Sequence, residues 1–238
     1  MGVDAIYGYD IMLTDIKALE ACAMKKLIII GAGGFGRETA WLVEQINSNS
    51  PEWDLLGFMD DNPDNWGKRI SGYTVLGGTQ SALDFPDAYY VCAVGASETR
   101  RRVIQRLEML LPNPKYAVLI DPRVVIANSI NIGDGTIICI SNVLTVDINV
   151  GRHTIINCDC VIGHDCRLGD FVTLYPSVNL SGNSTLGECV EMGTGSITIQ
   201  GISIGENTIV GAGAVVIRNL PPHCTAVGVP AKVIKQDI

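Results

Sequence analysis

Apolar residues recur at every sixth position along the second half of the chain. The series begins at Ile120, ends at Val216 and is interrupted only at Thr198. A period of six fits neither an α-helix nor an isolated alternating strand. It is typical of a parallel β-helix, in which each repeat consists of one short strand and one turn. We therefore expect residues 116–238 to form an all-β parallel β-helix that ends in a C-terminal cap.

The positions around this series support the prediction. Glycine often follows the apolar residue, as at Gly133, Gly163 and Gly187. A glycine is expected where a side chain would clash or where φ must be positive. Four positions after the apolar residue, the side chain is mostly small or β-branched, and these positions include Cys160 and Cys166. The interior should therefore be narrow, and both cysteines are expected to pack inside it.

Strands and helices alternate in residues 24–115. The pattern predicts strands at 27–30, 55–59 and 89–94, a glycine turn at 31–36, and helices at 37–46 and 98–111. This order indicates an α/β Rossmann-like domain with a small parallel sheet and helices on its faces. Pro112-Asn113-Pro114 ends the second helix and separates the two domains. Residues 1–23 fit neither domain, and we treat them as an extension of unknown role.

Composition and charge narrow the classes of function. The net charge of −8 argues against a general nucleic-acid or anionic-membrane binder, and no apolar run has the length of a membrane span. The eight cysteines show no zinc-type pairing, and no signal peptide precedes them. We therefore expect a cytoplasmic protein with no metal, no membrane and no nucleic-acid partner.

A glycine turn follows the first predicted strand. Gly31, Gly33 and Gly36 occupy the glycine positions of a G-x-G-x-x-G pattern that opens a helix. Free backbone N–H groups at such a helix start favour a diphosphate. Acidic residues at the end of the second strand, here Asp60 and Asp61, usually contact the ribose or base. A site for a nicotinamide cofactor and a simple tight turn remain alternative interpretations of the pattern. A redox role is disfavoured, because the repeat takes up the part of the chain in which a conventional substrate domain would lie.

Of the three histidines, His164 has the most suitable surroundings for catalysis. The repeat places it just after a corner and facing outward, and Asp165 follows it directly. An imidazole accepts a proton near neutral pH, and a neighbouring carboxylate orients the ring. A solvated turn histidine is the alternative. His153 and His223 are expected to be solvated turn residues, and the spacing gives no support for a three-histidine zinc site.

Three segments resemble the NeuD/PglD-type sugar acetyltransferases, which are hexapeptide-repeat acyltransferases. They are Leu-Leu-Gly-Phe-Met-Asp-Asp-Asn-Pro at 55–63, Ala-Val-Gly at 93–95, and NCDCVIGHDCRLGDF at 157–171. The resemblance extends over about residues 25–235. It implies a left-handed β-helix, a homotrimer with shared sites, and acetyl-CoA as co-substrate. It also implies that His164 is the general base and that Asp165 raises its basicity.

The resemblance also assigns binding residues by position. The nucleotide-linked sugar would lie against six residues of the first domain, with Asn157 near the acceptor group. Those six residues are Gly33, Gly34, Phe35, Asp60, Asp61 and Gly95. Family members often have His or Tyr where Phe35 stands. Acetyl-CoA would lie against Thr173, Gly182, Thr194, Gly211 and Ala212, where Thr173 replaces a histidine found in several members. Lys232 would either bind the CoA phosphates or have a structural role.

The function implied is transfer of acetyl from acetyl-CoA to an amino group of a nucleotide-linked sugar. Two alternatives remain: O-acetylation of a sialic acid or other sugar, and a non-catalytic trimeric scaffold that binds a nucleotide sugar. A metal-dependent hydratase would require stoichiometric zinc. The sequence does not identify the sugar or the nucleotide.

Overall fold

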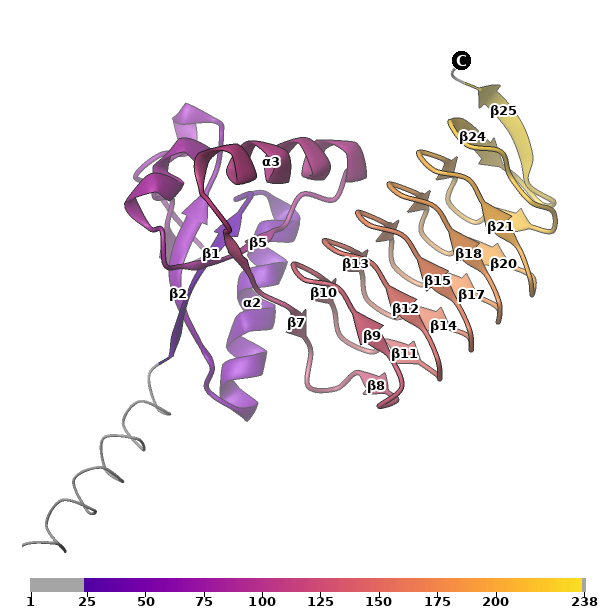
Figure 1. Cartoon of the computed structure of the whole chain (residues 1–238), viewed down its shortest axis with the longest axis horizontal. Coiled ribbons are helices and arrows are strands. Elements are labelled where there is room, and N and C mark those ends of the chain that lie inside the picture. The colour runs from indigo at the N-terminus through magenta and orange to yellow at the C-terminus, as the bar shows by residue number, and fades with distance from the viewer. Residues whose placement is uncertain (1–23, 237–238) are drawn as a thin grey trace, which may run out of the picture.

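A computed structural model describes residues 24–236 of the chain. The proposed extension, residues 1–23, lies outside the described residues. Figure 1 shows an α/β domain at the left, followed by a β-helix whose coils lead away from it toward the C-terminus. No helix in residues 24–236 combines the length and the apolar character that a membrane span requires.

The first domain is a four-stranded parallel sheet with a helix on each face. Its strands are β2 (Trp53–Met59), β1 (Lys25–Ile30), β5 (Tyr89–Cys92) and β6 (Lys115–Tyr116), in that spatial order. Along β1, Leu27 and Ile29 pack toward α2 (Gly34–Asn49), while Ile28 and Ile30 pack toward α3 (Ser97–Leu110). A sheet buried on both faces explains the unbroken apolar run of β1. The predicted strands and helices are all present.

Short elements fill the segment between β2 and β5. They are the 3-10 helices η1 (Pro63–Asn65) and η2 (Thr79–Asp84) and the hairpin of β3 (Arg69–Ile70) and β4 (Tyr73–Thr74).

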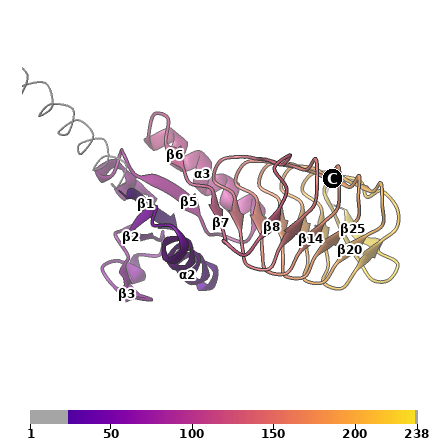
Figure 2. The same cartoon turned by 90° about the horizontal axis from the view of Figure 1, so that it is seen from below.

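The second domain is the predicted left-handed parallel β-helix. Its strands form three sheets, one on each side of the coil, and Figure 2 shows the stacked coils. The first sheet contains β7 (Leu119–Ile120), β10 (Ile137–Ile138), β13 (Ile155–Ile156), β16 (Thr173–Leu174), β19 (Glu191–Met192), β22 (Ile209–Val210), β24 (Cys224–Val227) and β25 (Lys232–Gln236). The second contains β8 (Val125–Ile126), β11 (Val143–Leu144), β14 (Val161–Ile162), β17 (Asn179–Leu180), β20 (Ile197–Thr198) and β23 (Val215–Val216). The third contains β9 (Asn131–Ile132), β12 (Asn149–Val150), β15 (Arg167–Leu168), β18 (Thr185–Leu186) and β21 (Ser203–Ile204).

The second residue of each of these two-residue strands is the periodic residue, and it points inward. Thr198, the one polar member of the series, is also buried, and its hydroxyl lies 3.0 Å from that of Ser184. Cys160 and Cys166 are fully buried, as predicted. Thr198 is tolerated in the apolar interior because a hydroxyl of the neighbouring coil lies within hydrogen-bond distance.

The glycines that directly follow a periodic residue are required by close packing between coils, and their φ angles are not positive. A Cβ added to Gly133 would lie 2.6 Å from the Arg152 nitrogen, and one added to Gly163 would lie 2.6 Å from the Gly182 nitrogen. The left-handed conformation falls instead on residues such as Asp159 and Asp165. Of the two reasons predicted for these glycines, steric clash is the one that applies.

Arg100 on α3 joins the two domains. Its guanidinium is fully buried and donates to the carbonyls of Gly95 at 3.0 Å, His153 at 2.8 Å and Phe171 at 2.8 Å, and to the Thr173 hydroxyl at 2.9 Å. Burial lowers the pKa of Arg100 to about 10, so the group stays charged at neutral pH. The turn at Gly95 is thereby held against the first sheet of the β-helix.

The start of α3 makes a second contact with the β-helix. The Ser97 backbone N–H and hydroxyl donate to the Glu191 carboxylate at 2.8 and 2.6 Å, and the Tyr175 hydroxyl donates to the same carboxylate at 3.2 Å. A carboxylate at a helix N-terminus is favourable. Glu191 thus fixes the direction in which α3 meets the coils.

The prediction for His153 was wrong. This residue is fully buried, with its ring 5.1 Å from that of Phe171 and 4.4 Å from that of Tyr116. The repeat places His153 at an outward corner, but the first domain covers that corner. His223 has a side chain 47% exposed, as predicted, and lies 3.5 Å from Glu206.

Candidate functional site

His164 and Asp165 form an exposed pair at the corner between the second and third β-helix sheets. Their side chains are 51% and 53% exposed, and Nδ1 of His164 lies 2.7 Å from Oδ2 of Asp165. Asp165 has φ of 60°, a left-handed conformation that aspartate tolerates better than most residues. With Nδ1 facing the carboxylate, Nε2 is the nitrogen available to a substrate. The arrangement suits a general base with its orienting acid.

Gly182 occupies the next coil directly under His164. The His164 carbonyl accepts a hydrogen bond from Asn183, which aligns the two coils at this corner. Any side chain at position 182 would overlap the imidazole. The predicted donor residue Gly182 therefore lies against the predicted base.

Three other predicted donor residues, Thr194, Gly211 and Ala212, lie on a different corner. They follow Asn157, predicted to lie near the acceptor group, along the edge between the first and second sheets. Thr194 and Ala212 are exposed there. The structure thus divides the predicted β-helix site between the two edges of the second sheet, with His164 and Gly182 on one edge and Asn157 on the other.

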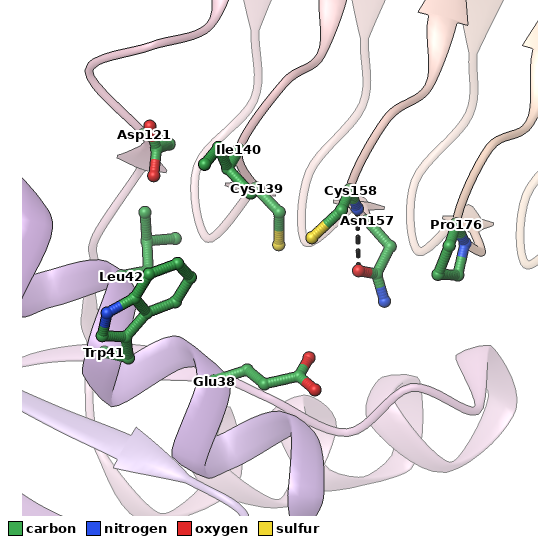
Figure 3. Close-up of a pocket in the computed structure, with 9 residues that line it drawn as sticks. All are labelled: Glu38, Trp41, Leu42, Asp121, Cys139, Ile140, Asn157, Cys158 and Pro176. Carbon is green, nitrogen blue, oxygen red and sulfur yellow. Dashed lines mark hydrogen bonds between the residues drawn. The ribbon is translucent and has the colours of Figure 1, made fainter.

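A pocket of about 340 Å³ lies beside Asn157, where α2 faces the β-helix (Figure 3). Helix α2 contributes Glu38, Trp41 and Leu42. The β-helix contributes Asp121, Cys139, Ile140, Asn157, Cys158 and Pro176. His164 is not among the lining residues. The pocket is mainly apolar, with a carboxylate and an amide at its rim, which is the usual character of a small-molecule site.

Sequence reasoning named only Asn157 of this pocket. The spacing of Glu38 and Trp41 at i and i+3 places them on one side of α2, and this spacing can be seen in the sequence alone. The six-residue period does not indicate which coil of the β-helix this face of α2 contacts.

The glycine turn is shaped by close approach of the backbone. A Cβ on Gly36 would lie 2.0 Å from the Gly31 carbonyl oxygen, and Gly31 has φ of 102°. Gly33 caps the N-terminus of α2, and a Cβ there would meet no atom within 4 Å. Gly34 borders a second hollow with Arg37, and this hollow shares Glu38 and Trp41 with the pocket. The turn and the pocket are therefore connected along one side of α2.

The side chains of Asp60 and Asp61 form hydrogen bonds and an ion pair with other residues of the first domain. Asp60 accepts a hydrogen bond from the Ala32 nitrogen at 2.9 Å and so holds the glycine turn. Burial alone would raise the pKa of Asp61, but hydrogen bonds from Thr79 and the ion pair with Arg106 outweigh it, and the net pKa is lowered. Phe35 is half-buried against the α2 core. Open space at the turn is found mainly at Gly33 and Gly34.

A family model for the PglD N-terminal domain matches residues 26–107. Solved structures of sugar acetyltransferases resemble nearly the whole chain. A histidine-to-asparagine variant of perosamine N-acetyltransferase from Caulobacter crescentus, in complex with CoA and GDP-perosamine, has 29% identity and a TM-score of 0.79, covering 90% of this chain and 99% of that one. The chain is thus similar to sugar acetyltransferases in both of its domains, as the resemblance to the NeuD/PglD-type proteins implies.

Two further solved structures also match the chain over both of its domains. The acetyltransferase domain of PglB from Neisseria gonorrhoeae, in complex with acetyl coenzyme A, has 29% identity and a TM-score of 0.77, covering 89% of this chain and 100% of that one. WeeI from Acinetobacter baumannii has 28% identity and a TM-score of 0.77 over the same shares of the two chains. No curated protein matches the chain by sequence.

Thr173, which stands where several members of the resembled family have a donor-binding histidine, lies at the contact between the two domains. It is 1% exposed, and its hydroxyl donates to the Gly95 carbonyl at 2.8 Å. The hydroxyl thus belongs to the contact between the domains, and a donor role for Thr173 stays a prediction. Within residues 24–236, no group of three or more His, Cys, Asp or Glu residues could hold a metal ion.

Proposed function

We propose that this protein transfers the acetyl group of acetyl-CoA to an amino group of a nucleotide-linked sugar, with His164 as general base. The observation that carries the proposal is the exposed pair of His164 and Asp165, 2.7 Å apart, on a two-domain frame shared with sugar N-acetyltransferases. Packing does not require this pair, because both side chains are about half exposed.

The chemistry follows from the orientation of the ring. Nε2 of His164 takes a proton from the amine as its nitrogen attacks the thioester carbonyl, and the Asp165 carboxylate stabilises the imidazolium that forms. The tetrahedral intermediate then collapses, the carbon–sulfur bond breaks, and the imidazolium returns the proton to the CoA thiolate. General-base catalysis of this kind contributes roughly 10²–10⁴-fold. No covalent enzyme intermediate is needed.

The acceptor would extend from the glycine turn to the pocket. The open backbone at Gly33 and Gly34, at the start of α2, suits the diphosphate. Asp60 holds that turn through Ala32, and Arg100 holds the turn at Gly95. The sugar would then reach Glu38, Trp41 and the Asn157 amide, because the two hollows share the first two of these side chains.

The outer face of the second β-helix sheet supports a shared site in a homotrimer. Val125, Val161 and Ile197 lie in one column of this face and are 64%, 41% and 40% exposed. Val143 and Val215 belong to the same column, which Asn179 interrupts. A largely apolar face of this kind is a typical protein interface. Because Asn157 and His164 lie on opposite edges of the same sheet, neighbouring copies could bring the two edges together.

The donor would lie along those edges, against Gly182, Thr194, Gly211 and Ala212. Thr194 and Ala212 are exposed, and Gly211 leaves room for Val227, whose side chain a Cβ there would meet at 2.7 Å. Lys232 is exposed on β25 and could reach the CoA phosphates.

A direct assay tests the proposal. The protein is incubated with acetyl-CoA and a panel of UDP-, GDP-, dTDP- and CMP-linked sugars with free amino groups, and products are identified by mass spectrometry. We expect one amide-linked acetylated nucleotide sugar. Acetylation only of hydroxyl groups would replace N- with O-acetyl transfer, and binding without turnover would identify a scaffold. Sedimentation at matched concentrations is expected to give a trimer.

A further inference from the structure

Two cysteines from adjacent coils face the same pocket. Cys139 follows β10 and Cys158 follows β13, and both line the pocket beside Asn157. The Cys139 nitrogen donates to the Ile156 carbonyl, so Cys139 is aligned with Asn157, and Cys158 is one residue further along the neighbouring coil. Figure 3 shows their sulfur atoms pointing toward each other.

This placement suits a disulfide. Ordinary β spacing between coils and along a strand separates such diagonal Cα atoms by about 6 Å, within the usual range for a disulfide. Both side chains also belong to one apolar cluster under the first domain. A bond between them would therefore require side-chain rotation and little backbone movement.

The two thiols differ in exposure and acidity. Cys139 is 8% exposed, and the neighbouring thiol and burial both raise its pKa. Cys158 is half-buried, and its pKa is lowered because Cys139 can donate a hydrogen bond to the thiolate. Burial and the charges of Glu38 and Asp121 oppose this shift. Cys158 is therefore the thiol suited to attack, and Cys139 the one suited to resolve.

The other cysteines in residues 24–236 lack this arrangement. Cys92, Cys160, Cys166, Cys189 and Cys224 are all buried. Burial raises the pKa of Cys92 and Cys160 to about 12. The thiols of Cys160 and Cys166 donate to the carbonyls of Tyr175 and Ser181 at 3.3 and 3.4 Å. The role of these five side chains is therefore to pack in the interior of the protein.

We propose that Cys158 and Cys139 form an oxidisable dithiol site that a peroxide closes to an intramolecular disulfide, and that closure lowers acetyl transfer. The Cys158 thiolate attacks a peroxide oxygen, the O–O bond breaks, and a sulfenic acid and hydroxide form. The Cys139 thiol then attacks the sulfenic sulfur, the S–S bond forms, and water leaves with the Cys139 proton. The two sulfur atoms together supply the two electrons that reduce the peroxide.

The disulfide would affect the acceptor pocket through Asn157. The Asn157 side-chain oxygen accepts a hydrogen bond from the Cys158 nitrogen at 2.8 Å. Because both cysteines line the pocket, rotation of their side chains on closure would change the pocket wall beside this amide, where the acceptor is proposed to bind. This effect on activity rests on the proposed function, whereas formation of the disulfide does not.

Peptide mapping of the full-length protein after hydrogen peroxide treatment tests the site. Free thiols are blocked with N-ethylmaleimide before digestion, and acetylated product is measured chromatographically. We expect a peptide pair linked through Cys139 and Cys158, a parallel loss of at least half the activity, and recovery of both on reduction with dithiothreitol.

Variants separate the roles of the two thiols. Cys139→Ser is expected to leave a sulfenic acid on Cys158 that dimedone traps, and Cys158→Ser to abolish both the adduct and the sensitivity to peroxide. Cys166→Ser, at a buried position where the next coil has Ser184, is the matched control and should behave like the native protein. The proposal is overturned if the native protein yields no Cys139–Cys158 link, or if Cys158→Ser stays as sensitive as the native protein. A link formed in a protein that acetylates no nucleotide sugar would overturn the proposed function and leave the dithiol site standing.

Discussion

Gly182 lies so close under His164 that a Cβ added to it would be 2.5 Å from Nε2 of the imidazole. The Gly182 φ is not in the left-handed region, so its backbone would accept another residue. The glycine is therefore explained by the histidine above it. This contact ties a predicted donor residue to the predicted base and leads to a specific test.

Gly182→Ala should displace the imidazole and lower kcat while the fold persists. The ring is half exposed and can move, so little stability should be lost. A displacement of about 1 Å at a catalytic group can cost on the order of 10²-fold in rate. The measurement is steady-state kinetics together with thermal unfolding. Gln200→Ala, one coil further along the same corner, is the control and should keep its kcat. Unchanged kcat in Gly182→Ala would contradict the positioning role.

Arg100→Met should weaken the contact between the domains. The substitution leaves the carbonyls of His153, Val94 and Phe171 without their buried donor. Unsatisfied buried acceptors cost about 1–3 kcal/mol each, so we expect a loss of at least about 3 kcal/mol in the free energy of unfolding. Denaturant titration measures this loss. The KM for the nucleotide sugar should also rise, because the Gly95 carbonyl loses one of the two hydrogen bonds that hold it.

Arg101→Met provides the comparison for Arg100. Arg101 is on the same helix, but its ion pairs with Glu98 and Glu188 are partly exposed. Such pairs contribute at most about 1 kcal/mol. Equal destabilisation by the two substitutions would argue against a special role for the buried guanidinium.

His153 should make the fold sensitive to acid. Burial, with smaller effects of Arg152 and Arg100, lowers its pKa from the ordinary 6.5 to about 3. Between these two values the unfolded chain binds the proton and the folded chain does not, so stability falls as the pH drops from 6.5 toward 3. The full shift corresponds to an upper bound of about 5 kcal/mol.

His153→Phe should remove this part of the acid sensitivity. The phenyl ring can keep the aromatic contacts to Phe171 and Tyr116, and the backbone carbonyl still accepts from Arg100. Denaturant titrations between pH 7 and pH 4 should therefore give a flatter stability profile than the native protein. The hypothesis fails if the two profiles have the same slope.

The six-residue period predicted the β-helix because the position of a residue in the repeat determines whether its side chain packs in the interior. Each periodic residue pairs with the periodic residue of the next coil, as Ile138 does with Ile156, so the sequence alone specifies an interior column. The α/β domain was also predictable, since the apolar run of β1 and the glycine turn at Gly31 are local signals. His164 and Asp165 stood out because the repeat leaves them facing outward.

Contacts between the domains could not be predicted in this way. His153 occupies a corner that the repeat exposes, and only the first domain buries it. Glu38 and Trp41 lie on α2, far in sequence from Asn157, and nothing local pairs them with it. Thr173 likewise donates a hydrogen bond to the Gly95 carbonyl across the domain contact. Long-range packing of this kind has no periodic signature.

The most direct test of the account is the turnover of His164→Gln with acetyl-CoA and the preferred nucleotide amino sugar. Glutamine keeps a polar side chain of similar reach but cannot act as a base near neutral pH. We predict a fall in kcat of roughly 10²–10⁴-fold, with the thermal unfolding midpoint and acetyl-CoA binding unchanged. Turnover within a few-fold of the native enzyme would contradict the assignment of His164 as the general base.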